Sequence, residues 1–187
     1  MSKVRLVILG FAALTLVAVG IGMGIQFLLG KGTVYVVEPG WAKTTQDVLI
    51  DGKGLDVTGE GNHRRYELSK GSHTLTLVDA QTKKQRAVPL KISNGFTEVV
   101  VPAEEDQCVV DMDMTSGYGE NSHFAPTVRG RYQDGPFDRP SSSYWSVKEL
   151  PKEIDEHGTA SVLINVPCSV LSLPDAKIAE LLLSTDK

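Results

Sequence analysis

The longest apolar run of the chain covers residues 4–30 and has no ionisable side chain after Arg5. As a helix with about 1.5 Å of rise per residue it would be roughly 40 Å long, which exceeds the ~30 Å hydrocarbon layer of a bilayer. It is also longer than the h-region of an ordinary signal peptide, which has roughly 7 to 15 residues. We therefore expect residues 1–30 to form a short cytoplasmic start and an uncleaved transmembrane anchor. The alternative is a signal peptide cleaved after residues 18–20.

Beyond this run, short β-type segments alternate with turn residues. Residues 73–78 alternate threonine with apolar residues, which is the period-two pattern of a half-buried strand. Residues 107–115 also alternate, with apolar residues on the expected core face and Asp111 and Asp113 on the expected solvent face. This spacing of strands predicts a mainly β fold, an antiparallel β-sandwich-like exterior part. The other expected strands are residues 33–37, 48–50, 64–68, 87–92, 96–101 and 159–166, with shorter extended pieces at 147–151 and 168–171.

The chain closes with a segment of helical character. Residues 174–183 begin with a proline and continue with good helix formers, which predicts a short C-terminal helix. Ile178, Leu181 and Leu182 share one face of this helix and are expected to pack on the sheet. The expected domain organisation is an anchor at 1–30, a first β domain at 31–102, and a second β segment at 103–187 packed with the first.

A pair of segments in the first β part resembles a known family. Residues 47–53 read Asp-Val-Leu-Ile-Asp-Gly-Lys, and residues 70–77 read Lys-Gly-Ser-His-Thr-Leu-Thr-Leu. The pair resembles the PEGA-type β domain, whose repeats couple a V-x-I-D-G strand to a G-x-H-x-V-x-V strand. The resemblance covers residues 34–102, without the Pro-Glu-Gly-Ala stretch that names the family. It implies an exported or membrane-anchored bacterial protein and a module that is not itself catalytic.

Composition limits the classes of partner. Two of the 19 Lys and Arg lie in the first 30 residues, so the rest carries 17 basic and 23 acidic side chains and a formal charge of −6. This balance and the lack of a basic patch argue against nucleic-acid binding. The sequence has no nucleophile elbow, no phosphate-binding glycine loop and no His-Glu-x-x-His helix. We therefore expect no catalytic residue, no metal site and no cofactor.

The chain has two cysteines, Cys108 and Cys168. In an oxidising compartment an even pair far apart in sequence is a candidate disulfide, and both residues lie in or beside strand-like runs. Free buried thiols are the alternative, while a zinc site is disfavoured because no further ligand type clusters with them. We expect Cys108 and Cys168 to be bonded, on the condition that this part of the chain is exported.

The charges that flank the apolar run bear on its orientation. Lys3 and Arg5 lie at its start and Lys31 directly follows it, so the positive-inside rule slightly favours a cytoplasmic N-terminus. Together with the cysteines, this predicts a single-pass inner (cell) membrane protein whose bulk is periplasmic or extracellular. Gly20 and Gly24 are four apart on one helix face, a pattern that lets two transmembrane helices approach closely. A homodimer through these glycines is one reading, and ordinary helix composition is the other.

Residues 116–146 interleave glycine, proline and serine with aromatic residues. A flexible linker would be depleted in aromatic residues, and long ordered loops are often functional. We predict that this region binds a protein or an envelope polymer, and the alternative is that its rings pack under their own loops. The candidate binding residues are Tyr118, Phe124, Tyr132, Phe137, Tyr144 and Trp145.

Two classes of function follow. The first, which we expect, is a membrane-anchored, non-catalytic extracytoplasmic β protein with a protein or envelope partner. The second is a small hydrolase-like or metal-dependent enzyme that uses loop residues 116–146, where the local acid/base groups are Ser122, His123, Asp134 and Asp138. Convergent polar groups with perturbed pKa values in a pocket would favour the enzyme, and an open aromatic patch would favour binding.

Overall fold

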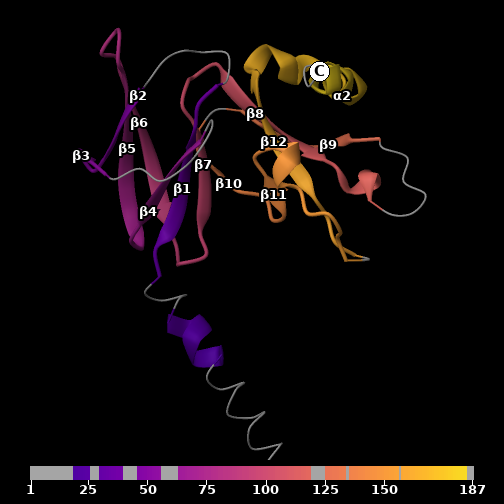
Figure 1. Cartoon of the computed structure of the whole chain (residues 1–187). Coiled ribbons are helices and arrows are strands. Elements are labelled where there is room, and N and C mark those ends of the chain that lie inside the picture. The colour runs from indigo at the N-terminus through magenta and orange to yellow at the C-terminus, as the bar shows by residue number, and fades with distance from the viewer. Residues whose placement is uncertain are drawn as a thin grey trace, which may run out of the picture.

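The computed structural model describes residues 19–25, 30–39, 46–55, 63–118, 125–133, 135–155 and 157–184. Within these residues the fold is mainly β, with three four-stranded sheets followed by a short C-terminal helix (Figure 1). Most neighbouring strands are antiparallel, as the sequence pattern predicts. Two neighbouring pairs, β1 with β7 and β11 with β12, are parallel.

The three sheets are named here A, B and C. Sheet A has the order β10-β7-β1-β4, with β1 (Gly32–Val37), β4 (His63–Leu68), β7 (Glu98–Pro102) and β10 (Phe137–Asp138). Sheet B has the order β3-β2-β5-β6, with β2 (Gln46–Ile50), β3 (Lys53–Gly54), β5 (Gly71–Asp79) and β6 (Gln85–Ile92). Sheet C has the order β11-β12-β8-β9, with β8 (Gln107–Asp113), β9 (Thr127–Tyr132), β11 (Ser143–Tyr144) and β12 (Ser161–Pro167).

The sheets stack in the order B, A, C, and the C-terminal helix α2 (Asp175–Ser184) covers the outer face of sheet C. Successive side chains of one strand point to opposite faces, so each strand of a middle sheet serves two cores. In β1, Val34 and Val36 pack against sheet B, while Tyr35 and Val37 pack against sheet C. Sheet A is thus buried on both faces, which explains why β1 is almost continuously apolar.

Sheet C is also covered on both faces, and this corrects one expectation. Val110 and Met112 of β8 belong to the core beneath α2, while Val109 packs with residues of sheet A. Asp111 shares the face of Val109, and only 1% of it is exposed. The prediction that Asp111 lies on a solvated face is wrong because a second sheet covers that face, which strand periodicity by itself does not reveal.

The C-terminal segment confirms part of the pattern. Helix α2 forms as predicted, and Ile178 is fully buried in the core under it. Leu181 is 42% exposed, so its predicted packing on the sheet is wrong. Leu181 and Leu182, three and four positions after Ile178, lie on opposite sides of the helix line that passes through Ile178. The side with Leu181 faces water.

Two segments expected to be extended are 3-10 helices instead. They are η3 (Cys168–Ser172) and η2 (Val147–Glu149), and a third such helix, η1 (Thr115–Gly117), follows β8. At η3 the chain leaves sheet C directly after Pro167, and the backbone N–H of Cys168 donates to the carbonyl oxygen of Asp106 at 2.8 Å. That bond ends the ladder of β12 and turns the chain towards α2.

The predicted disulfide is present. Cys108 of β8 and Cys168 of η3 are bonded, with 4.9 Å between their Cα atoms. Cys108 is fully buried in the core between sheet C and α2, and Cys168 is partly buried and packs against that core. The bridge therefore holds the segment that leads into α2 against the face of the sheet that α2 covers.

The apolar N-terminal run is described only in part. Residues 19–25 are helical, and Val19, Ile21, Met23 and Ile25 of this stretch are 54–60% exposed. Among the described residues, no helix has both the length and the apolar character needed to cross a bilayer. The rest of the predicted anchor, residues 1–18 and 26–29, lies outside the described residues. Gly20 and Gly24 lie in the helical stretch, with open space where a Cβ would stand.

Gly32, the first residue of β1, provides a test of how the chain enters the β fold. A Cβ at this position would stand 2.6 Å from Ile92 Cγ2 and 3.0 Å from the carbonyl oxygen of Thr97. We expect Gly32→Ala to lower the free energy of unfolding by about 1–3 kcal/mol, because the strand must shift to relieve the overlap. Urea unfolding of the full chain in detergent measures this effect.

The matched control for that substitution is Gly54→Ala, since no heavy atom lies within 4 Å of the Cβ position at Gly54. Gly54 is also a strand residue, so the general effect of replacing glycine in a strand is common to both variants. Equal stability of the two variants would show that the contact at Gly32 is not close.

Candidate binding surface

An open groove of about 740 Å³ lies between the turn at residues 93–97 and the segment 138–144. The first wall continues from β6 of sheet B, and the second connects β10 of sheet A to β11 of sheet C. The groove is therefore built where all three sheets contribute. We call it the Phe96–Tyr144 groove, and its lining includes Lys91, Asn94, Phe96, Arg139, Ser142 and Tyr144.

The first wall is a turn closed by its own polar groups. Asn94 Oδ1 accepts a hydrogen bond from the backbone N–H of Phe96 at 2.8 Å, and Thr97 Oγ1 accepts one from the backbone N–H of Ser93 at 3.2 Å. The carbonyl oxygen of Thr97 also accepts from the N–H of Thr33 at 2.8 Å. The Phe96 ring takes no part in these bonds and is 55% exposed.

This turn also corrects a strand boundary. Residues 96–101 were expected to be one strand, but β7 begins at Glu98. Phe96 lies before the ladder because the polar bonds of Asn94 and Thr97 extend the turn through residue 97. β-propensity marks Phe96 as a strand residue, and local side-chain bonds to the backbone override it here.

The second wall is fixed by Arg139. Its Nη1 donates to the Tyr35 hydroxyl at 3.1 Å and to Glu98 Oε2 at 3.2 Å, and its Nε donates to Ser143 Oγ at 3.2 Å. Its guanidinium carbon lies 5.0 Å from the centre of the Tyr35 ring and 5.2 Å from that of Trp145. The Arg139 side chain thus links the β10–β11 connection to β1 and β7, the two central strands of sheet A. Its positive charge is paired with the Glu98 carboxylate.

The protonation of the groups around Arg139 follows from burial. Burial, followed by the nearby Glu98 carboxylate, raises the pKa of Tyr35 above its usual value, so the hydroxyl stays protonated at neutral pH. Burial lowers the pKa of His63, whose ring is stacked on Trp145 with 4.7 Å between centroids. A neutral imidazole is therefore the packed form, and these groups act as a rigid frame.

The six aromatic residues that were predicted to bind a partner lie in different parts of the fold. Tyr132 and Phe137 are stacked with 4.1 Å between centroids, and together with Trp145 they pack against the core between sheets A and C. The Tyr118 hydroxyl donates to the carbonyl oxygen of Pro151 at 2.7 Å. Tyr144 lines the groove. Phe124 lies outside the described residues.

Sequence reasoning did not select Phe96 or Arg139. Phe96 follows an Asn-Gly turn, and an aromatic residue directly after such a turn is a signal that could have placed it at a loop tip. The role of Arg139 in joining the walls to sheet A has no local signal, because its partners in that sheet, Tyr35 and Glu98, are 104 and 41 positions away in the chain.

Of the four residues expected to form the site of the enzyme alternative, one lies among the described residues. Asp138 lies in β10 at the edge of sheet A, whereas Ser122, His123 and Asp134 lie outside the described residues. In the part of the chain that the structure describes, no three His, Cys, Asp or Glu side chains come together in a way that could hold a metal ion. The absence of a cofactor stays a prediction.

Comparisons of this chain with protein families, with curated proteins and with solved structures find no match.

Proposed function

We propose that the chain is a membrane-anchored, non-catalytic extracytoplasmic protein that holds a protein or envelope-polymer partner in the Phe96–Tyr144 groove. The observation that carries this proposal is the groove itself, with aromatic side chains on both walls and polar groups between them. Aromatic side chains supply large contact areas at low entropic cost, and polar groups placed between them fix the orientation of a ligand.

The rigidity of the walls supports binding. The bonds of Asn94 and Thr97 hold one wall, and those of Arg139 hold the other. Ser142, with a φ of 57°, forms a tight turn at the rim, where it and Ser141 are exposed. A surface already ordered in the free protein loses little conformational entropy when a partner binds.

The proposed location is supported by two independent features. The apolar run at residues 4–30 is long enough to cross a bilayer with some tilt. The disulfide is the second, because such bonds persist in oxidising compartments and are rare in the cytosol. The first feature supports membrane anchorage, and the second supports an extracytoplasmic position for the β fold.

Photo-crosslinking tests the proposed binding site. We expect benzoylphenylalanine placed at Ser142 or Tyr144 of the full chain in bacterial membranes to give a discrete adduct. The control position is Gln81, which is exposed in the turn between β5 and β6 at the other end of the sandwich. Digestion with a glycan hydrolase then separates an adduct with an envelope polymer from one with a protein. Adducts of equal yield at Gln81, or none at the groove positions, would contradict the proposal.

A further inference from the structure

One end of the β-sandwich carries the apolar N-terminal run. At this end Gly32, the first residue of β1, pairs with Leu68 of β4, and Gly71 of β5 pairs with Ile92 of β6. Gly32 also lies directly against Ile92, which brings the two sheets together there. The apolar run ends at Gly30, so in sequence only Lys31 lies between it and β1. We call this end of the sandwich the anchor end.

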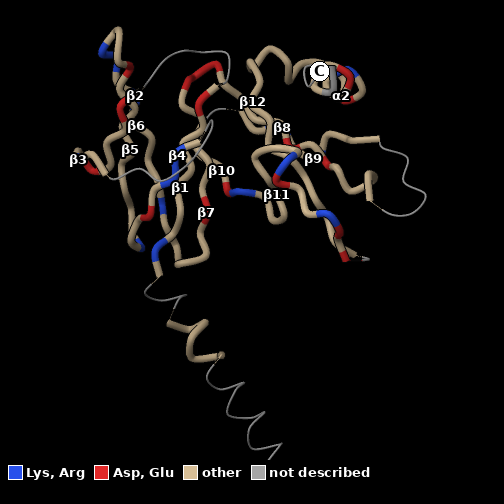
Figure 2. Tube along the Cα trace, viewed as in Figure 1, with Lys and Arg blue, Asp and Glu red and all other residues tan. Residues whose placement is uncertain are grey.

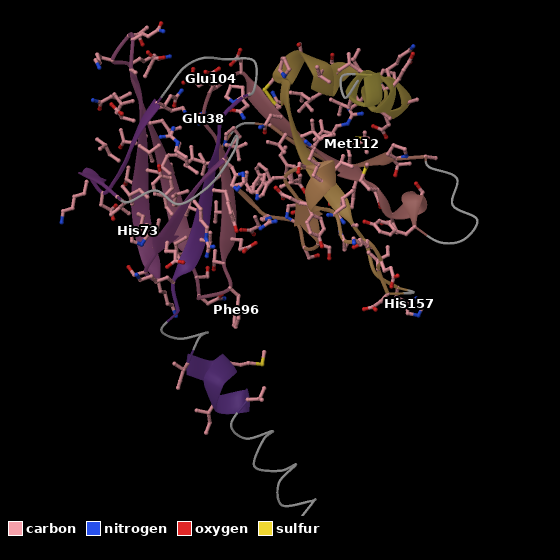
Figure 3. All side chains as sticks on the ribbon, in the orientation of Figure 1. Glu38, His73, Phe96, Glu104, Met112 and His157 are labelled. Atoms are coloured by element: carbon pink, nitrogen blue, oxygen red, sulfur yellow. A yellow bond between two sulfur atoms is a disulfide. The ribbon has the colours of Figure 1, made fainter. Side chains whose placement is uncertain are left out.

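Phe96 projects from the anchor end. Figure 3 shows its ring at the tip of the turn between β6 and β7, on the side of the sandwich from which the chain continues to residues 19–25. The ring is 55% exposed, and it makes none of the hydrogen bonds that close the turn. The fold therefore does not require a large apolar side chain at this position.

Three basic side chains lie at the anchor end. Lys31 directly precedes β1, Lys70 lies between β4 and β5, and Lys91 is the penultimate residue of β6, and all three are exposed. In Figure 2, which colours Lys and Arg blue, blue segments lie at this end of sheets A and B. Among the described residues, no ion pair includes any of these three lysines.

Two carboxylates at this end are paired, Glu67 with Arg65 and Glu98 with Arg139. A third, Asp138, is exposed and lines the groove together with Lys91 and Phe96. The anchor end thus presents one exposed aromatic ring and three exposed ammonium groups that no described carboxylate pairs with, although the exterior part as a whole is acidic. This local reversal of charge points to an anionic partner at this end.

We infer that the anchor end rests on the bilayer, with Phe96 in the boundary between head groups and acyl chains and with the three lysines facing lipid phosphates. Aromatic side chains favour that boundary, and lysine stems reach along apolar surface to place their charge at the phosphates. The inference rests on the proposed membrane anchorage. The turn that carries Phe96 forms one wall of the groove, so with this ring in the lipid boundary a partner is held at the membrane surface by the other lining residues, such as Asn94, Arg139 and Tyr144.

Fluorescence of the full chain in vesicles tests this contact. The vesicles contain phosphatidylethanolamine and phosphatidylglycerol, with or without lipids brominated near the top of the acyl chain. The variants are Phe96→Trp and the matched control Gln81→Trp. Because β5 has nine residues, its two ends lie roughly 27 Å apart, so Trp at position 81 cannot reach the lipid from the far turn. Subtracting the wild-type emission removes the shared contribution of Trp41 and Trp145.

We expect the emission of Trp at position 96 to be blue-shifted and lost in brominated vesicles, and that at position 81 to be unchanged. Lys70→Glu with Lys91→Glu should reduce the quenching, and unchanged quenching would overturn the role of the lysines. A chain that floats with the vesicles but keeps Trp at position 96 in water would overturn the inference and leave the anchor in place. A chain that does not float with vesicles would overturn the proposed anchorage and this inference with it.

Discussion

Replacing Arg129 with methionine is expected to lower the free energy of unfolding by about 3–5 kcal/mol, because a buried carboxylate would lose its partner. Arg129 Nε lies 2.7 Å from Asp111 Oδ2, and the Asp111 side chain is only 1% exposed. Arg129 Nη2 also donates to Ser161 Oγ at 2.9 Å, which joins β9 to β12 across β8. Methionine keeps the length and apolar stem of arginine, so the lost charge and hydrogen bonds dominate the effect. Urea unfolding of the full chain in detergent measures it.

The matched control is Lys84→Met, which breaks an ion pair with Glu105 on the surface. Its two side chains are 72% and 67% exposed, so the expected loss is about 0–1 kcal/mol. A second variant, Asp111→Asn with Arg129→Met, should recover part of the stability, because the buried charge is removed together with its partner. A loss for Arg129→Met no larger than that of the control would show that Asp111 is hydrated in solution.

Removing the disulfide has an expected effect of similar size. We expect Cys108→Ala with Cys168→Ala to lower the free energy of unfolding by about 2–5 kcal/mol, with ~4 kcal/mol from the chain-entropy model. The bridge joins residues 60 positions apart, so the unfolded chain regains the freedom of a long loop. The change leaves sheet A and its core with sheet B untouched, because both cysteines lie between sheet C and α2.

Thermal unfolding of the double variant, compared with wild type, measures this loss. Wild-type protein reduced and alkylated under denaturing conditions and then refolded is a second form without the bridge. Both forms should unfold at a lower temperature than the oxidised protein. The same midpoint for oxidised and bridge-free protein would show that the bond adds no stability, and ready alkylation of both thiols without prior reduction would show that the bond is absent in solution.

The two β parts of the chain are connected through the middle of the fold. β10, from residues 137–138, completes the edge of sheet A, whose other strands precede residue 103. The rings of Tyr132, Phe137 and Trp145 then fill the space between sheets A and C. Three of the six aromatic residues selected from the sequence thus contribute to packing between layers. The groove that we propose as the binding site uses Tyr144 with residues from the first β part.

Local sequence was sufficient for much of the architecture. Period-two alternation and turn residues located most of the strands, and the turn at Asp51 and Gly52 has the positive φ angles that such a dipeptide favours. Proline at residue 174 and the helix formers after it located α2. The disulfide was also predictable, since two cysteines allow one pairing. Each of these features depends on neighbouring residues or on a simple count, so the linear sequence contains it.

The number of covered faces was decided only by the tertiary structure. Alternation shows which residues of β8 share a face, but it does not show that a second sheet covers the face with Asp111. The position of Arg139 was decided in the same way, because its partners in sheet A lie 41 and 104 positions away. Periodicity describes one strand against one core, whereas the groove forms where three sheets meet. Its geometry therefore arises from contacts between segments that no local pattern relates to one another.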